Sequence, residues 1–198
     1  MLANIIKHNP KSVIVVAPET YFFKSKFFHR ILAEAKQEIH LFCRETYSYC
    51  LLNSMIFQPI HVYLSQDTAL YLTMDDLTKL GKSTVRSVLG SYDLLCMRTD
   101  KESAKFGSAV TKHLHRYKLL VKDISASIEF EDFISLVQYS RYVYTDRLHV
   151  AILGSIFGKE VFLFPNSYYK NKGVFEYSLW RNPKLRFICN PETDLIPQ

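Results

Sequence analysis

Short apolar runs rich in β-branched residues recur along the whole chain, and helix-type patterns lie between them. This alternation is typical of βαβ units, in which a helix connects each strand to the next parallel strand. The sequence therefore predicts an α/β fold with mostly parallel sheets. The expected strands are residues 13–17, 39–43, 60–64, 94–98, 118–121, 141–144, 161–164 and 186–189, and the expected helices are residues 24–36, 45–54, 101–114, 130–139, 148–157 and 174–180.

The strand pattern lapses between residues 66 and 92, in a polar stretch that contains Gly81 and Gly90. Three expected strands precede this stretch and five follow it. Three strands are few for an independent doubly wound sheet, whereas five are a usual number. We therefore predict a partial N-terminal Rossmann-like domain over residues 1–75 and a C-terminal Rossmann-like domain over residues 76–198.

Charge and hydropathy narrow the classes of partner and compartment. The net charge of +6 favours anionic partners, among them phosphorylated substrates, lipid diphosphates, nucleic acid and an anionic membrane surface. No apolar run approaches the roughly 18 residues of a membrane span, and polar residues 7–10 interrupt the apolar start. The sequence therefore predicts a cytoplasmic protein without a signal peptide.

The cysteines are scattered, and three lie within or beside apolar segments. Such placement predicts buried free thiols and argues against a disulfide framework or a metal site. The four cysteines are Cys43, Cys50, Cys96 and Cys189.

Arginines follow two of the expected strands, at the strand end where open parallel sheets bind ligands. Arg44 follows strand 39–43, and Arg98 ends strand 94–98. Arg44 is either an anion ligand or one half of a surface pair with Glu45. Arg98 is either an anion ligand or part of a helix start without a ligand role. The second alternative arises because Thr99 and Asp100 after it are natural caps for helix 101–114.

The strongest candidate site is the segment Thr145–His149, between a strand and an apolar helix. Asp146 is the expected helix cap, and Arg147 and His149 fall in the first turn, where main-chain N–H groups and the helix dipole favour an anion. Residues two apart point to different sides of a regular helix, so both reach one ligand only if the helix starts irregularly. The alternative is an arginine at a helix start with an incidental histidine.

A polar loop follows strand 161–164. Asn166 and Ser167 offer neutral hydrogen bonds there, and Lys170 and Lys172 offer charge, although the same residues suit a purely structural loop. Asp67, after strand 60–64, is either a carboxylate that faces the ligand cleft or a solvated loop residue. The chain has no G-x-G-x-x-G, P-loop, H-E-x-x-H or G-x-S-x-G motif, which argues against dinucleotide, ATPase, zinc-protease and serine-hydrolase functions.

Taken together, these segments resemble the polysaccharide pyruvyl transferase family, and their order and spacing match along almost the whole chain. The resemblance implies a GT-B-like pair of Rossmann-like domains, of which the N-terminal one is incomplete because the family's glycine-rich strand-turn segment before strand 13–17 is missing. It also implies transfer of a pyruvyl group from phosphoenolpyruvate onto a sugar, as a ketal in a surface polysaccharide or exopolysaccharide precursor. The matching segments are Arg44, Glu45 and Ser48, and residues 66–69, 98–102, 145–149 and 165–173.

The resemblance also assigns roles and partners. The family's phosphoenolpyruvate ligands correspond to Arg44, Arg147, Leu148 and His149, and we expect Arg147 and His149 to act in catalysis. The expected acceptor is a sugar or a lipid-linked saccharide, with no cofactor, no metal and no nucleic acid; peripheral association with the inner membrane face and a homo-oligomer stay open. Alternatives are a GT-B-type glycosyltransferase that uses a nucleotide sugar, and a truncated, non-catalytic sugar-binding subunit. The full substrate-binding set is Arg44, Arg98, Arg147, Leu148, His149, Asn166, Ser167, Lys170 and Lys172.

Overall fold

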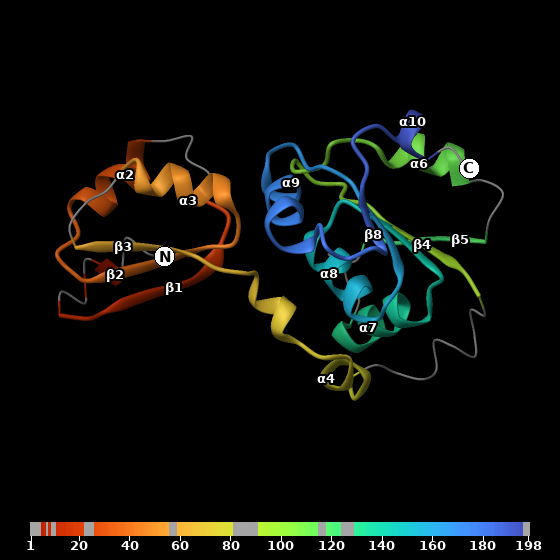
Figure 1. Cartoon of the computed structure of the whole chain (residues 1–198), viewed down its shortest axis with the longest axis horizontal. Coiled ribbons are helices and arrows are strands. Elements are labelled where there is room, and N and C mark those ends of the chain that lie inside the picture. The colour runs from red at the N-terminus through yellow and green to blue at the C-terminus, as the bar shows by residue number, and fades with distance from the viewer. Residues whose placement is uncertain are drawn as a thin grey trace. The chain divides into compact units, whose positions relative to one another are not determined.

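A computed structural model describes residues 5–6, 8, 11–21, 26–55, 59–80, 91–114, 118–123 and 129–195 (Figure 1). Gly81 and Gly90 of the polar stretch lie outside these residues. The chain divides into two units: unit 1 comprises Met1–Thr68 and Glu176–Ser178, and unit 2 comprises Ala69–Phe175 and Leu179–Gln198. Residue 75, where we placed the domain boundary, lies in unit 2, and the interpretation of the first domain as partial stays a prediction.

Unit 1 is built on a three-stranded parallel sheet in the order β1-β2-β3. Alternate side chains point to one face, where Ile14, Ile39 and Leu41 form a core with Leu32 and Leu52 of the helices. The helices therefore lie on this face (Figure 1). The elements are β1 (Ile14–Glu19), α2 (Lys26–Ala33), β2 (Ile39–Cys43), α3 (Thr46–Asn53) and β3 (Ile60–Leu64).

Unit 2 contains a five-stranded parallel sheet in the order β5-β4-β6-β7-β8. The strand that follows β4 in the chain pairs on one side of it, and the next strand pairs on the other side, so the strand order reverses at β4. The strands are β4 (Asp93–Cys96), β5 (Leu119–Val121), β6 (Tyr142–Thr145), β7 (Glu160–Leu163) and β8 (Leu185–Phe187).

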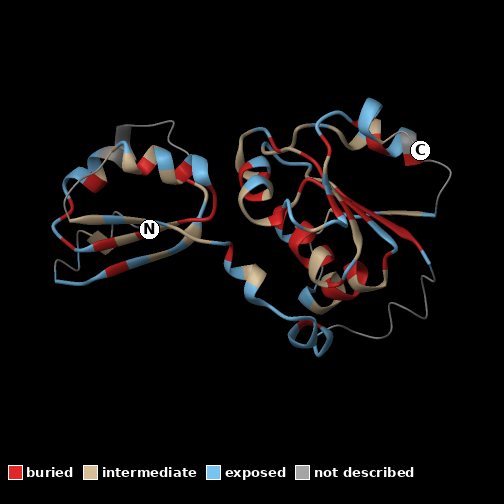
Figure 2. Cartoon of the chain, viewed as in Figure 1, coloured by how far each residue is buried: buried red, intermediate tan, exposed pale blue. Residues whose placement is uncertain are grey.

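Helices cover the sheet of unit 2, and its central strands are buried (Figure 2). Those at the core are α7 (Phe130–Tyr139) and α8 (Leu148–Ile156), both expected from the sequence. The other helical elements are η1 (Thr68–Tyr71), α4 (Met74–Thr78), α6 (Gly107–Leu114), α9 (Lys170–Val174), the π-helix η2 (Phe175–Leu179) and α10 (Pro191–Asp194).

Two glycines fix how α8 sits on the sheet. A Cβ on Gly154 would lie 2.9 Å from Cγ2 of Val161 in β7, so glycine permits a close approach of helix and strand. Gly158 has φ +64°, and the N–H groups of Gly158 and Lys159 donate to the last carbonyls of the helix. Gly158 therefore ends the helix in the left-handed conformation that glycine adopts most easily.

All eight expected strands occur, and the α/β prediction is confirmed. The expected helix 101–114 begins only at Gly107, because Asp100 and Thr99 bind Arg98 and Asp123 and do not cap a helix. The expected helix 174–180 is a π-helix that α9 precedes. Residues 165–173 were expected to form a loop, but residues from Lys170 onward form α9, and η1, α4 and α10 were not predicted either.

The prediction of buried thiols is half wrong. All four cysteines are free, and Cys43 and Cys96 are buried, but Cys50 and Cys189 are exposed because they lie in a short surface helix and after an edge strand. Within the described residues, no helix has the length and apolarity that a membrane span requires. The cytoplasmic location stays a prediction.

Candidate functional site

The candidate site lies at the carboxyl ends of β4 and β6, where the strand order of unit 2 reverses. Ligands of open α/β sheets bind at such reversals. The main-chain N–H of Arg98, after β4, donates to Oδ1 of Asp146, after β6, over 2.7 Å. Asp146 is 3 % exposed, so the carboxylate joins the two strand ends from inside the protein.

The start of α8 differs from the sequence expectation, because Asp146 does not cap it. Arg147 is the cap residue, with φ −97° and ψ 114°. Its N–H donates to Oγ1 of Thr145 over 2.9 Å, and that hydroxyl donates to the Cys96 carbonyl over 2.7 Å. The extended backbone at Arg147 turns its side chain away from the regular helix, in which His149 lies.

Both arginines of this edge hold carboxylates. Arg147 pairs with Asp123, which follows β5 and also accepts hydrogen bonds from Thr99. Arg98 forms two bonds to Asp100, of 2.9 and 2.7 Å, and lies 3.0 Å from Glu102. Each guanidinium therefore binds a side-chain carboxylate of the protein. A carboxylate or phosphate of a ligand would take the place of that side chain.

The loop after β7 adds a buried amide. Asn166 is 7 % exposed, and its Oδ1 accepts from the N–H of Asn171 over 3.0 Å. Among the described residues, Nδ2 of Asn166 has no hydrogen-bond partner. Because an unpaired buried donor costs free energy, this amide suits a ligand acceptor.

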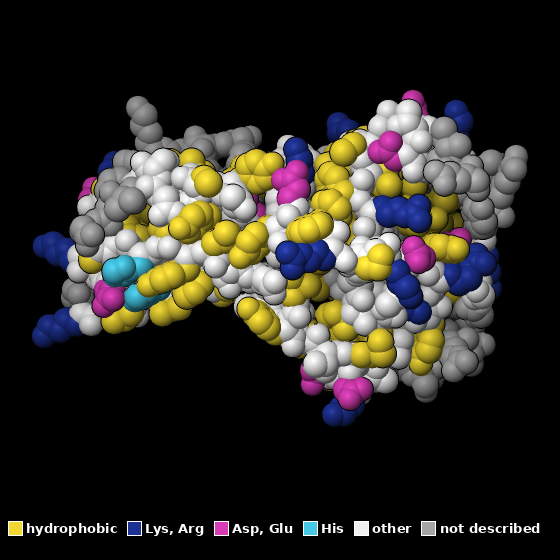
Figure 3. Space-filling model, in the orientation of Figure 1, with side chains coloured by type: hydrophobic (Ala, Val, Ile, Leu, Met, Phe, Trp, Pro, Cys, Tyr) yellow, Lys and Arg dark blue, Asp and Glu magenta, His cyan; other side chains and the backbone are white. Residues whose placement is uncertain are grey.

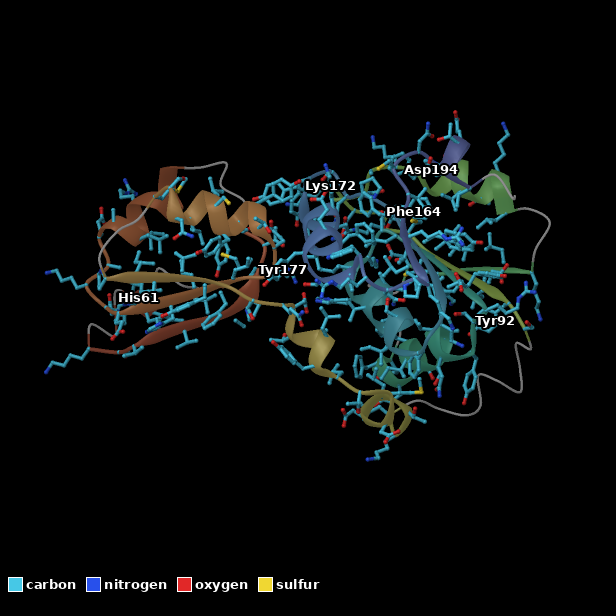
Figure 4. The ribbon with its side chains drawn as sticks, in the orientation of Figure 1. His61, Tyr92, Phe164, Lys172, Tyr177 and Asp194 are labelled. Carbon is cyan, nitrogen blue, oxygen red and sulfur yellow. The ribbon has the colours of Figure 1, made fainter. Side chains whose placement is uncertain are left out.

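The other residues predicted from this loop divide into two groups. Ser167 donates its N–H to the Glu102 carbonyl over 3.1 Å, and Nζ of Lys170 lies 3.8 Å from the Glu102 carboxylate. The structure thus joins them to the Arg98 network. Lys172 is exposed on α9 (Figure 4). Leu148 packs in the core, so any ligand contact there would come from its main chain.

His149 is exposed and borders a different feature. It shares one face of α8 with Ile152, Leu153 and Ile156, and this face lines a cavity of about 310 Å³ together with α7 and the segment from η1 to α4. Histidine is the polar member of an otherwise apolar lining. The side chains of Arg147 and His149 therefore lie on different sides of the start of α8, as their spacing of two residues predicts.

Charge within the site is nearly balanced. Burial raises the pKa of Asp146, although the Arg98 N–H and both arginines oppose this effect. The hydrogen bond from Arg98 lowers the pKa of Asp100 to about 2, so Asp100 is ionised at neutral pH. Three cations, Arg98, Arg147 and Lys170, thus face several carboxylates, and an anionic ligand would compete with them.

Arg44, in unit 1, lies in a closed cluster. Its guanidinium contacts Glu19 at the end of β1, Thr20, and Asp67 after β3, and the Asp67 contact is 2.7 Å long. Of the two alternatives for Asp67, the solvated loop residue is wrong, because Asp67 is 2 % exposed. Arg44 and Glu45 are not a surface pair either, since Glu45 is buried and accepts from the Ser48 N–H. The ligand role of Arg44 stays a prediction.

Sequence reasoning missed two members of the unit 2 site. Asp123 follows an expected strand, so the rule that pointed to Arg98 would also have found it. Asn171 donates its side-chain N–H groups to the Asp146 and Phe164 carbonyls, over 2.7 and 2.8 Å, and nothing in the sequence singles it out. Within the described ranges, no group of His, Cys, Asp and Glu is arranged to hold a metal ion.

Comparisons with known proteins agree with this architecture. A family model described as polysaccharide pyruvyl transferase matches residues 5–168. A solved structure of a functionally uncharacterised protein from Klebsiella pneumoniae subsp. pneumoniae NTUH-K2044 is 30 % identical with a TM-score of 0.61, and the match covers 89 % of this chain and 63 % of that one. This chain therefore spans less than two thirds of that relative, and no curated protein matches it. The chain belongs to the polysaccharide pyruvyl transferase family.

Proposed function

We propose that this protein transfers a pyruvyl group from phosphoenolpyruvate to a sugar of a surface polysaccharide or exopolysaccharide precursor and forms a ketal. The observation that carries the proposal is the convergence of Arg98 and Arg147 at the strand-order reversal of unit 2, and the unpartnered Asn166 amide lies in the loop after the neighbouring strand β7. Family membership supports a transferase, and these residues suit a small donor with two anionic groups.

Donor binding follows from exchange of anions at the arginines. Arg147 and Arg98 would release Asp123 and Asp100 in part and take the phosphate and carboxylate of phosphoenolpyruvate. A planar guanidinium group can bind a carboxylate or a phosphate through two parallel hydrogen bonds, whereas the ammonium group of lysine cannot form this pair of bonds. Nδ2 of Asn166 would donate to a donor oxygen and so gain the partner that it lacks in the protein.

Chemistry then requires a proton and two sugar hydroxyls. A proton added to the methylene carbon of phosphoenolpyruvate gives a cationic centre at the neighbouring carbon. One hydroxyl attacks this centre, phosphate leaves, and the second hydroxyl closes the ketal, with two hydroxyl protons released. Donation of the first proton and a bond to the leaving phosphate both suit an imidazole. Because His149 lies on the side of α8 that borders the apolar cavity, either role requires the donor to extend from Arg147 to that side.

Ligand-dependent stability tests donor binding. We expect phosphoenolpyruvate, and not nucleotide sugars, to raise the melting temperature, because a ligand stabilises the state that binds it. Arg147→Gln should remove this shift, whereas Arg186→Gln, at an exposed position of β8, should keep it. A shift with nucleotide sugars alone would support the glycosyltransferase alternative and contradict the proposal.

Turnover tests the reaction. With a sugar acceptor, we expect phosphate release and a pyruvylated product, and we expect His149→Ala to abolish both with an unchanged melting temperature, because its side chain is exposed. Unchanged turnover in His149→Ala would disprove its role. Donor binding without turnover by the unmodified chain would favour the non-catalytic sugar-binding subunit.

A further inference from the structure

Four strands of the unit 2 sheet begin directly after a cationic residue. These residues are Lys118 before β5, Arg141 before β6, Lys159 before β7 and Lys184 before β8. Because the strands are parallel, their amino ends meet at one edge of the sheet, opposite the edge that holds the candidate site. Strands about 4.8 Å apart place the four residues in a row about 19 Å long. We call this row, together with Trp180 and Arg181 shortly before β8, the basic edge.

Main-chain hydrogen bonds hold the strand starts side by side. The N–H of Asp93, the first residue of β4, donates to the Lys118 carbonyl over 2.9 Å. At the other end of the row, the Val161 N–H donates to the Lys184 carbonyl over 2.8 Å. The sheet therefore fixes the spacing of the cations. Figure 3 shows Lys and Arg side chains beside hydrophobic ones on the visible face of unit 2.

Positive charge is in excess at the basic edge. Asp93 and Glu160 begin two of the strands, but Asp93 is 1 % exposed and pairs with Arg141 over 3.0 Å. Burial lowers the pKa of Lys159, and the neighbouring charge of Lys184 lowers it further, so the two lysines repel each other. The carboxyl end of α8, which Lys159 follows, favours one cation here but does not explain a repelling pair. An anionic partner would offset this repulsion.

Aromatic rings lie among the cations of the basic edge. Trp180 is 55 % exposed, and the guanidinium of Arg181 lies over its ring, 5.0 Å from the ring centroid. Tyr142 is 37 % exposed, and the Arg141 guanidinium lies 6.0 Å from its centroid. Tryptophan, tyrosine and long cationic side chains are enriched where a lipid membrane meets water, because each combines an apolar body with a polar or charged end.

The same pairs of cation and ring argue against nucleic acid as the partner. Bases of single strands bind by stacking on open aromatic faces. At Trp180 and Tyr142, a guanidinium of the protein lies over one face of the ring. Lipid phosphates need no open ring face, because they bind the cationic groups themselves. The basic edge therefore suits a lipid surface better than a nucleic acid.

We propose that the basic edge docks unit 2 on an anionic lipid surface. The lysines and arginines of the row bind lipid phosphate groups, and Trp180 enters the headgroup layer. Each cation close to such a surface increases binding about fivefold. The candidate site lies at the opposite edge of the sheet and stays accessible, so the proposal does not depend on the proposed reaction.

Vesicle binding tests the proposal, and Trp180 reports on it directly because it is the single tryptophan of the chain. The full chain is mixed with vesicles of phosphatidylcholine alone, or of phosphatidylcholine with phosphatidylglycerol. We expect co-sedimentation and a shift of the Trp180 emission to shorter wavelength only with the anionic vesicles. Both effects should weaken as the salt concentration rises, because salt screens the charges.

Removal of charge locates the docking surface. Lys159→Gln combined with Lys184→Gln should weaken vesicle binding about 25-fold, because two cations are lost. Arg181→Gln, at an exposed position, should weaken it about fivefold and is a second test that does not involve the half-buried Lys159. Lys122→Gln is the matched control, because Lys122 is exposed directly after β5, at the opposite edge of the sheet. It should leave vesicle binding unchanged.

Melting temperatures show whether these variants fold. The double lysine variant should melt no lower than the unmodified chain, because it removes a repelling pair. Three outcomes would overturn the proposal: no binding to anionic vesicles, equal binding to both kinds of vesicle, or binding that Arg181→Gln and the double variant leave unchanged. An emission shift with single-stranded DNA or with inorganic phosphate, and with neither kind of vesicle, would also overturn it and identify a different anionic partner.

Discussion

Each unit places arginine and aspartate at the carboxyl ends of parallel strands, yet the two clusters differ in access. In unit 1 the side chains of Arg44 and Asp67 are only 5 % and 3 % exposed, and the cluster reaches solvent through Glu19, which is 56 % exposed. In unit 2 the side chains of Arg147 and Asp123 are 13 % and 16 % exposed, and Asp100 is 45 % exposed. The same residue types thus form a closed clamp in one sheet and an accessible anion site in the other.

Strand order explains the difference. The strands of unit 1 follow one another in the order β1-β2-β3, so Arg44, directly after the central strand, lies between Glu19 of β1 and Asp67 after β3. In unit 2 the order reverses at β4, and the connections after β4 and β6 diverge to opposite sides. A reversal of this kind opens a crevice, whereas sequential order does not. Residue type alone therefore does not identify a ligand site.

Arg44→Leu is the strongest way to break this comparison. If Arg44 is a clamp, its loss leaves the buried Asp67 carboxylate without the guanidinium and lowers the free energy of unfolding by about 3–5 kcal/mol. Arg147→Leu should cost less, about 1.5–3 kcal/mol, because the side chains of Arg147 and Asp123 are 13 % and 16 % exposed and water reaches the carboxylate that is left. Urea unfolding measures both. Equal losses in the two variants would show that the clusters do not differ as their burial indicates.

Gly154→Ala tests whether the site at Arg147 depends on the close packing of α8 against the sheet. The added methyl would meet Cγ2 of Val161, so we expect a loss of about 1–3 kcal/mol and weaker donor binding through displacement of Arg147. Val161→Ala in the same chain should restore part of the stability. Ser155→Ala, the matched control on α8, should be close to neutral, because its hydroxyl is buried without a partner among the described residues.

Asp146→Asn tests the buried carboxylate that joins the strand ends, with the smallest expected effect. Burial raises the pKa of Asp146, so the folded protein keeps its proton to higher pH than the unfolded chain does. The unmodified protein should therefore lose stability relative to Asp146→Asn as pH rises above about 4, the unfolded value. The asparagine Oδ1 keeps the bond from the Arg98 N–H.

Asp100→Asn is the control for the direction of the pH dependence, because the pKa of Asp100 is shifted in the opposite direction to that of Asp146. The Arg98 bond lowers the pKa of Asp100, so its contribution is present above pH 4 and lost as pH falls toward about 2. Melting temperatures measured from pH 3 to 8 for the three proteins separate the two carboxylates. Parallel curves for Asp146→Asn and the unmodified protein would contradict the effect of burial on Asp146.

Local pattern was enough to predict most of the elements. All eight strands and the helices α7 and α8 follow from local apolar patterns, because each of these segments contributes apolar side chains to one of the cores. The late start of α6 could not be predicted. Thr99 and Asp100 are natural caps, but Asp123 and Arg98, brought close by the sheet, bind them more effectively.

The sequence by itself determined the α/β class and the family, and it pointed to the strand ends as candidate ligand sites. Only the tertiary structure decided which strand ends meet. Pairing of β6 beside β4 brings Asp146 to Arg98. The arginine–aspartate pair of this site is more exposed than the pair of Arg44 and Asp67. The physical reason is that strand order is set by packing between distant segments, and a local pattern of residues carries no information on it.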